Sequence, residues 1–196
     1  MSNKIKIGFA MCGSFCTFKA VIEQMENLVN SGYDVTPIMS FNAYSLDTRF
    51  GKASEIVEKI EGICGKKIVN SIVDAEPIGP KKMFDVLLVA PCTGNTLAKL
   101  ANSIVDTPVC MAVKSHLRNK RPVVIAISTN DALSGCAKNI GTLMNLRSYY
   151  FVPFCQDNCM QKPTSLVAQF DKIPQTIEYA LNETQLQPMA EGAILP

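Results

Sequence analysis

The sequence predicts an α/β fold, a three-layer sandwich in which one open parallel sheet lies between two layers of helices. Short apolar segments typical of buried strands alternate with longer segments whose apolar residues recur at helical spacing. The connections are short, so right-handed crossovers would bring the strands together in one sheet. The 196 residues, of which 47% are hydrophobic and 18% charged, suffice for one core, and we expect a single domain over residues 1–196.

The first half of the chain contains two predicted strands, each followed by a helix. Residues 4–11 form the first strand, and the helix after it carries one apolar face and ends at Gly32. Residues 33–39 form the second strand and lead into a polar loop at residues 40–43. A helix from about residue 52 to residue 63 follows.

The second half repeats this alternation around a strand at residues 85–91. Its continuous apolar run is typical of a central parallel strand that is covered on both faces. The pattern predicts two more strands, at residues 122–128 and 149–154, and a polar loop at residues 156–165. It predicts helices at residues 95–103, 107–117, 131–146 and 174–181, before a tail without a clear period.

Small polar residues cluster where the predicted strands end. In a parallel sheet these ends meet at one edge, which is where such folds bind ligands. Hydroxyls, amides and backbone N–H groups at helix starts can bind a phosphate dianion without lysine or arginine. The sequence therefore predicts a phosphorylated cofactor, held by Gly13, Ser14, Ser40, Asn42, Pro91, Cys92, Thr93, Asn95, Thr96, Ser128, Thr129 and Asn130.

The spacing of these residues favours a mononucleotide. Neither the G-x-G-x-x-G fingerprint of dinucleotide sites nor the G-x-x-x-x-G-K-[ST] loop of nucleotide hydrolases occurs in the chain. FMN needs one monophosphate cradle and a place for a flat ring, which suits strand ends rich in serine and threonine. The alternative is that these residues are ordinary helix caps, because the same residue types are preferred there.

Composition argues against several other classes of protein. A net charge of +2 gives no basic field of the kind that binds nucleic acid. No apolar run approaches the roughly 18 residues that span a bilayer, so we expect a cytoplasmic protein without membrane contact. Most of the eight cysteines are then free thiols, and the C-x-x-x-C spacing at residues 12–16 and 155–159 is wider than a zinc knuckle, so we predict no metal site.

Residues 91–96 also carry a family resemblance. Their sequence, Pro-Cys-Thr-Gly-Asn-Thr, resembles the Pro-Ala-Ser-Ala-Asn-Thr signature of the flavoprotein family that includes phosphopantothenoylcysteine decarboxylase, lantibiotic-peptide decarboxylases and flavin prenyltransferase. The resemblance implies a flavodoxin-like sheet, FMN bound at strand ends and across the boundaries between protomers, and homo-trimers that assemble further. Further similar segments extend it over essentially the whole chain, at residues 76–80, 116–119, 128–131, 151–154 and 156–157.

Those further segments imply one branch of the family, a protein that helps to make a pyridine dicarboxylate found in spores. Its partner would be a separate nicotinamide-dependent protein, and its substrate a small dicarboxylate that a flavin oxidises. The decarboxylases of the family use a histidine after the second strand, whereas the only histidine here is His116. Decarboxylation of cysteine peptides is therefore not expected, and a non-catalytic scaffold that stabilises the partner stays open as the alternative.

Individual residues have competing roles. Asn95 is our first candidate for contact with flavin or substrate, with a helix cap as its alternative, and His116 is a weaker catalytic candidate. Cys92 fits a packing role better than a redox role. Lys162 is a candidate to close over an anionic substrate, and Arg118 and Arg121 offer cations for a dicarboxylate, with plain surface placement as the alternative for all three. Apolar surface at residues 109–113 and 193–195 predicts a homo-oligomer.

Overall fold

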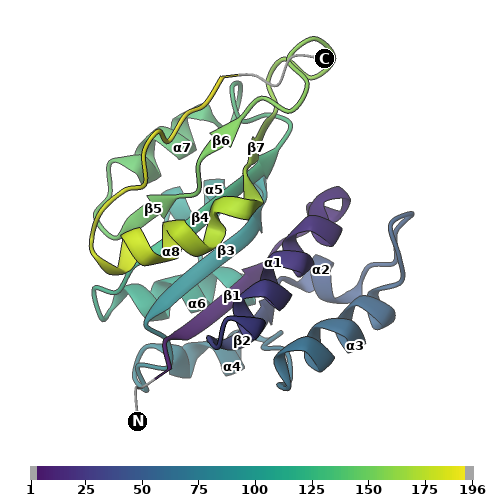
Figure 1. Cartoon of the computed structure of the whole chain (residues 1–196), viewed down its shortest axis with the longest axis vertical. Helices are drawn as coiled ribbons and strands as arrows, with labels where there is room; N and C mark the ends of the chain where they lie inside the picture. The colour runs from purple at the N-terminus through teal and green to yellow at the C-terminus, as the bar shows by residue number, and fades with distance from the viewer. Residues whose placement is uncertain (1–3, 193–196) are drawn as a thin grey trace.

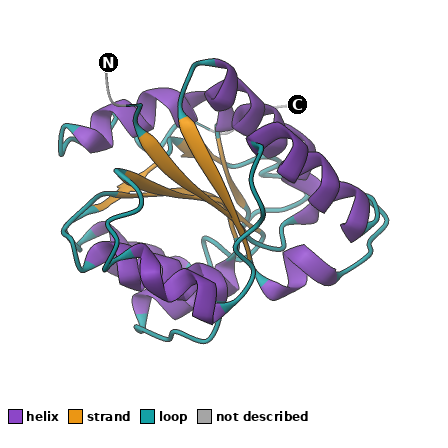
Figure 2. Ribbon diagram, turned by 90° about the horizontal axis from the view of Figure 1, so that it is seen from below, coloured by secondary structure: helices purple, strands orange, loops and turns teal. Residues whose placement is uncertain are grey.

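The computed structural model describes residues 4–192, which form an open sheet between two layers of helices (Figures 1 and 2). Its parallel part has the order β2-β1-β3-β4-β5, the flavodoxin-like order, and the chain reverses its winding between β1 and β3. These strands are β1 (Lys6–Met11), β2 (Asp34–Met39), β3 (Val86–Cys92), β4 (Val123–Thr129) and β5 (Tyr149–Phe151). All five lie within the ranges that the sequence predicts, apart from one residue at the end of β3 and of β4.

The predicted open sheet is confirmed, but it is mixed, because an antiparallel pair of strands extends its parallel part at one edge. β6 (Phe154–Cys155) pairs antiparallel with β7 (Leu166–Ala168), and β7 pairs antiparallel with the end of β4. The predicted strand at residues 149–154 is divided because Pro153, which has no N–H to donate, lies between β5 and β6. β4 thus pairs with β5 along its first half and with β7 at its end.

The helices divide between the two faces of the sheet, as Figure 2 shows. One face packs against α1 (Phe18–Asn30), α3 (Ala53–Cys64) and α8 (Ile173–Leu181). The other packs against α4 (Ile72–Ala75), α5 (Gly94–Ala101), α6 (Pro108–Leu117) and α7 (Ala137–Met144). Strand side chains alternate between these two cores, because successive residues of a strand point to opposite faces.

Two helix predictions differ from the structure near the strand ends. Residues 41–43 of the predicted loop are helical and begin a short helix, α2 (Phe41–Ser45). Ser40 Oγ caps this helix by accepting a hydrogen bond from the N–H of Ala43. The predicted helix at residues 131–146 is shorter, since the chain makes turns before α7 and the N–H of Leu133 donates to the carbonyl of Thr164. Short 3-10 turns lie at Phe15–Thr17, Glu76–Ile78 and Phe170–Lys172.

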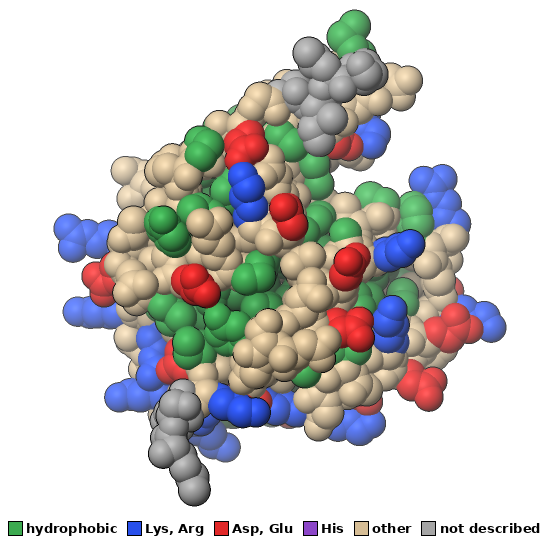
Figure 3. Space-filling model, in the orientation of Figure 1, with side chains coloured by type: hydrophobic (Ala, Val, Ile, Leu, Met, Phe, Trp, Pro, Cys, Tyr) green, Lys and Arg blue, Asp and Glu red, His purple; other side chains and the backbone are tan. Residues whose placement is uncertain are grey.

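The apolar segment at residues 109–113 does not provide the exposed surface that we expected. Val109 and Val113 are buried within the chain itself, on the face of α6 that packs against the sheet. Residues 193–195 lie outside the described residues. Figure 3 shows that acidic and basic side chains are spread around a central area of hydrophobic side chains on one face of the molecule. Within residues 4–192, no helix combines the length and the apolar character needed to cross a membrane.

Candidate functional site at the strand ends

A cavity of about 240 Å³ lies where β1, β3 and β4 end. In Figure 3 this side of the molecule is hollowed between the segment that leads into α1 and the loop at residues 156–165, which we call the late loop. Hydroxyl groups dominate the lining. Six predicted cofactor residues line it, namely Gly13, Ser14, Thr93, Ser128, Thr129 and Asn130. The fold therefore brings together residues that are up to 117 positions apart in the sequence, as Gly13 and Asn130 are.

Two of these hydroxyls form a direct bridge across the cavity. Ser14 Oγ and Ser128 Oγ lie 2.8 Å apart and share a hydrogen bond. Ser14 precedes the 3-10 turn after β1, and its hydroxyl does not cap that turn. Ser128 lies in β4 and is only 6% exposed. Since each hydroxyl has one proton and the bridge uses one of the two, the pair keeps one donor for a ligand.

The end of β4 approaches the start of α5 closely. Thr129 Oγ1 donates a 2.6 Å hydrogen bond to Asp131 Oδ1. A Cβ atom at Gly94 would lie 2.6 Å from that same oxygen and 2.8 Å from Thr129 Oγ1. Both distances are shorter than van der Waals contact, so a larger residue at position 94 would displace the Thr129 and Asp131 side chains from their hydrogen bond.

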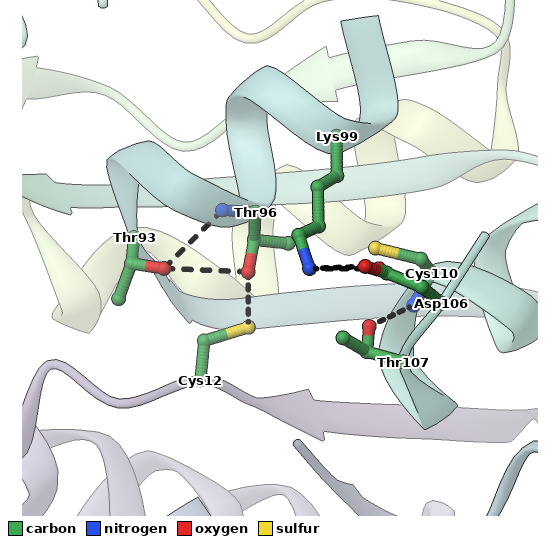
Figure 4. Close-up of polar contacts among 7 residues, drawn as sticks. All are labelled: Cys12, Thr93, Thr96, Lys99, Asp106, Thr107 and Cys110. Atoms are coloured by element: carbon green, nitrogen blue, oxygen red, sulfur yellow. Dashed lines mark hydrogen bonds and ion pairs between the residues drawn. The ribbon is translucent and has the colours of Figure 1, made fainter. Parts of the chain in front are cut away.

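Thr93 is the residue that caps α5, as Figure 4 shows. Its Oγ1 accepts a hydrogen bond from the N–H of Thr96 at 3.4 Å. Thr96 Oγ1 donates in turn to the Sγ of Cys12, at 3.2 Å, beneath the helix. Burial raises the pKa of the Cys12 thiol to about 12, so the sulfur is a neutral acceptor. Thr96 thus points into the core and joins α5 to the end of β1, instead of lining the cavity.

Comparison with known proteins agrees with this architecture. A family model described as Flavoprotein matches residues 1–178. The chain belongs to the flavoprotein family. The family resemblance inferred from residues 91–96 is therefore confirmed.

Within the flavoprotein family the chain is similar to the B subunit of dipicolinate synthase. It is 50% identical to that protein of Bacillus subtilis (strain 168) over 184 residues, 94% of this chain and 92% of the relative. The crystal structure of the same kind of protein from Bacillus halodurans is 46% identical, covers 97% of both chains and superposes with a TM-score of 0.89. The FMN-dependent cysteine decarboxylase SpaF, 22% identical over 91% of this chain and 96% of its own, shares the fold with a TM-score of 0.67.

Asn95, the first catalytic candidate on this flavoprotein fold, does not cap a helix. It is the second residue of α5, after the cap Thr93, and its side chain is exposed. The side chain makes no hydrogen bond with any residue from 4 to 192, so its amide is available to a ligand. It does not line the 240 Å³ cavity, and a ligand that reaches it extends past the cavity mouth.

Ser40 and Asn42 lie beside the cavity but do not line it. The Ser40 hydroxyl is used as the cap of α2, and its N–H donates to the carbonyl of Met11 at the end of β1. Asn42 is exposed, and its Cβ atom lies 3.8 Å from the position that a Cβ atom would take at Gly13. Of the two, Asn42 therefore has the freer side chain next to the first strand end.

Pro91 and Cys92 differ from the prediction, because both side chains are buried away from the cavity. Cys92 is fully buried among apolar residues, and burial raises the pKa of its thiol well above the ordinary value. A neutral, inaccessible thiol is a poor nucleophile, so Cys92 packs the core. The carbonyl of Pro91 accepts a hydrogen bond from the N–H of Cys12, which fixes the end of β3 beside the end of β1.

His116 lies at the opposite edge of the sheet, and the structure does not bring it to the other candidates. Its Nε2 is 3.1 Å from the carbonyl oxygen of Pro122, the residue before β4. Because β4 has seven residues, this carbonyl is roughly 20 Å from the strand ends. His116 is 1% exposed, and burial lowers its pKa to about 4. This placement removes the geometric basis for a catalytic role.

The late loop supplies cavity residues that our site prediction omitted. Asp157, Lys162 and Ser165 line the cavity, together with Cys16 and Thr17 from the segment before α1. Lys162 Nζ lies 3.0 Å from Asp157 Oδ2. The loop is attached to the end of β4, because Thr164 Oγ1 donates to the carbonyl of Asn130 at 2.6 Å. The sequence indicates Lys162 as a candidate cation, but only the fold shows that its loop folds back over β4.

Arg121, another candidate cation, makes contacts that serve the fold. Arg121 lies 3.4 Å from Asp85 and also donates to the carbonyl of Phe84, which fixes the start of β4. Among the residues that the structure describes, no group of three or more histidine, cysteine or acidic side chains is arranged to hold a metal ion.

Proposed function

We propose that this chain is a cytoplasmic, FMN-binding B subunit of dipicolinate synthase, acting with the A subunit to form dipicolinate from a dihydrodipicolinate-type precursor during sporulation. The observation that carries the proposal is the hydroxyl-lined cavity at the strand ends of a flavoprotein-family fold. The 50% identical relative is named as one subunit of a synthase, which supports a partner. Among the structures that share this fold, DmrB from Burkholderia xenovorans is a cubic protein cage in complex with FMN.

The residues at the strand ends fit the phosphate end of FMN. Ser14 and Ser128 offer hydroxyls, and the first turn of α5, which Thr93 caps, offers N–H groups that have no partner inside the helix. A volume of about 240 Å³ is smaller than the roughly 300–1,000 Å³ of complete cofactor sites. The cavity therefore suits the phosphate and the polyol chain. The flat ring would extend past Asn95 toward a neighbouring protomer of a homo-trimer or larger assembly.

Lys162 gives the cavity its cation. Its ion pair with Asp157 holds the ammonium group beside the hydroxyls. The pKa of Asp157 is lowered: burial raises it, but hydrogen bonds, led by the one from Lys162, lower it more. Asp157 is thus ionised at neutral pH and keeps Lys162 in place until an anion competes for it. A phosphate or a substrate carboxylate is such an anion.

The proposed reaction is aromatisation. A dihydropyridine dicarboxylate loses a hydride and a proton as it becomes aromatic; FMN, when bound, would supply the hydride acceptor, and the proton would pass to water. The chain would orient the reactants and keep water away, with Asn95 donating to the flavin edge or to a carboxylate.

One observation favours the scaffold alternative. The only histidine of the chain is buried at the far edge of the sheet, so it cannot serve as a general acid or base at the cavity. In the alternative, the site is vestigial and the chain stabilises the A subunit. The two functions differ in flavin binding, which can be measured directly.

The test is a titration of the purified chain with FMN, FAD and NADPH, followed by reconstitution with the A subunit. We expect a flavin spectrum and micromolar or tighter binding of FMN, in preference to FAD and NADPH. Light scattering at the same concentration should give the mass of a homo-oligomer. Failure of all three ligands to bind would leave the scaffold function, and a monomeric mass would contradict a flavin site shared between protomers.

A further inference from the structure

A second cavity, which we call the α6 groove, lies on the face of the sheet that carries α5 and α6. It has a volume of about 420 Å³ and shares no lining residue with the strand-end cavity. The loop between α5 and α6, one side of α6 and the start of β5 form its walls. Its volume falls within the roughly 300–1,000 Å³ of small-molecule sites. The lining residues are Leu100, Ser103, Ile104, Val105, Cys110, Val113, Lys114, Leu117, Arg118 and Tyr149.

The groove combines an apolar floor with two cationic side chains and a phenol hydroxyl, all of which can donate hydrogen bonds. Lys114 and Arg118 lie one turn apart along α6 and its C-terminal end, and neither forms an ion pair with any described residue. Side chains at this spacing are neighbours on a helix surface, with Cβ atoms about 5–6 Å apart. The Tyr149 hydroxyl has no hydrogen-bond partner among residues 4–192. Burial raises its pKa to about 12, so it stays protonated and can donate.

The groove contains no acidic side chain that would neutralise these donors. Asp106, on the loop that forms one wall, is already paired, because Lys99 Nζ lies 2.7 and 2.8 Å from its two carboxylate oxygens (Figure 4). Thr107 caps α6 by accepting a hydrogen bond from the N–H of Cys110 at 3.2 Å. These contacts fix the wall of the groove in place, so the donors face a preformed site.

We infer that the α6 groove binds a small planar organic anion with two carboxylates. The ring would lie on the apolar floor, and the carboxylates would reach Lys114 and Arg118, with Tyr149 donating a further hydrogen bond. A guanidinium group matches carboxylate geometry, and its neighbour one turn away suits a second carboxylate on the same ring. The site is separate from the proposed flavin cavity, so it binds its ligand whether or not the chain holds FMN.

Calorimetric titration of the full chain with isophthalate, benzoate and dipicolinate tests this inference. The choice of dipicolinate as a probe rests on the proposed function, whereas the choice of isophthalate and benzoate does not. A chelator in the buffer removes metal ions that would bind dipicolinate. We expect both dicarboxylates to bind with one site per chain, and benzoate to bind about tenfold more weakly because it has one carboxylate.

Variants locate the binding. Lys114→Gln and Arg118→Gln should each weaken isophthalate binding about threefold to tenfold, the lower value reflecting solvent screening of the charges. Tyr149→Phe should weaken it about threefold. Lys59→Gln, which removes an exposed lysine on α3, is the matched control and should leave the affinity unchanged. FMN affinity should be the same in all four variants.

Three results would overturn the inference. They are equal isophthalate affinity in every variant, an equal loss in Lys59→Gln, and competition between isophthalate and FMN for one site. Melting temperatures of the variants are measured alongside, since Tyr149 is partly buried. If Tyr149→Phe does not fold, the two cation variants still decide the matter. Absence of FMN binding together with normal isophthalate binding would reject the proposed function and leave the α6 groove intact.

Discussion

Ser14 Oγ and Ser128 Oγ lie 2.8 Å apart, although 114 residues separate them in the chain. The pair connects the loop after β1 to β4, which lies two strands away in the sheet because β3 runs between them. The link spans the end of the central strand and forms one wall of the strand-end cavity. A polar bridge at this position suits a ligand that contacts both loops at once.

Removal of one hydroxyl of this bridge should lower FMN affinity. Ser128→Ala deletes a hydroxyl at the proposed phosphate site, and a hydrogen bond to a charged group contributes about 1.5–3 kcal/mol, which corresponds to about twelvefold to 160-fold in affinity. FMN fluorescence quenching measures the change. Ser54→Ala, on the exposed side of α3, is the control. Equal affinity in the two variants would show that the bridge does not face the cofactor.

Replacement of Thr93 should lower stability, whereas replacement of Asn95 should lower ligand affinity. Thr93→Ala removes the cap of α5 and should cost about 1 kcal/mol, or about 2–4 °C in melting temperature. Asn95→Ala should leave the melting temperature unchanged, because the side chain caps nothing and is exposed. It should weaken FMN binding or product formation in the reconstituted enzyme. Unchanged affinity and turnover would remove Asn95 from the site.

Gly94→Ala should destabilise the fold. The added Cβ would lie 2.6 Å from Asp131 Oδ1 and 2.8 Å from Thr129 Oγ1, so these two side chains must shift and break their mutual hydrogen bond, or the start of α5 must move. Overpacking of this kind costs about 1–3 kcal/mol, measurable as a lower urea midpoint. Gly62→Ala is the matched control, since a Cβ on this glycine of α3 meets nothing within 4 Å. Similar stability of the two variants would contradict the close approach.

His116 should make stability depend on pH. Burial lowers its folded-state pKa to about 4 from an ordinary value near 6.5, so the unfolded chain binds the proton more readily. The contribution of His116, about 3 kcal/mol, is therefore complete above pH 6.5 and is lost as the pH falls toward 4. Urea unfolding from pH 7 to pH 4 should show a steeper loss for the wild type than for His116→Gln.

The same His116→Gln variant tests the location of catalysis. Because the imidazole lies at the far edge of the sheet, the turnover of folded variant in the reconstituted enzyme should match the wild type at pH 7. A large loss of turnover with normal FMN affinity would instead show that the far edge of the sheet takes part in the reaction.

The course of the main chain was largely readable from the sequence, but the antiparallel edge was not. Periodicity identified the parallel strands and most helices, since burial on one face imposes a repeat of two or of 3.6 residues. β6 and β7 have two and three residues, too few to show a period. Their pairing depends on the late loop, which folds back on the end of β4 through Thr164 and Asn130.

The sequence by itself determined the family, the order of strands and helices, and the small polar character of the strand ends. Only the tertiary structure decided which of these polar residues reach the cavity. Beyond the end of a strand, side chains no longer alternate between the two faces of the sheet, so the contacts with neighbouring residues set the direction of each side chain. Thr96 turns inward because Cys12 accepts its hydrogen bond, whereas Ser14 is held at the cavity by Ser128. Lys162 reaches the same cavity because the late loop is attached to β4, a contact between residues distant in sequence that no local pattern encodes.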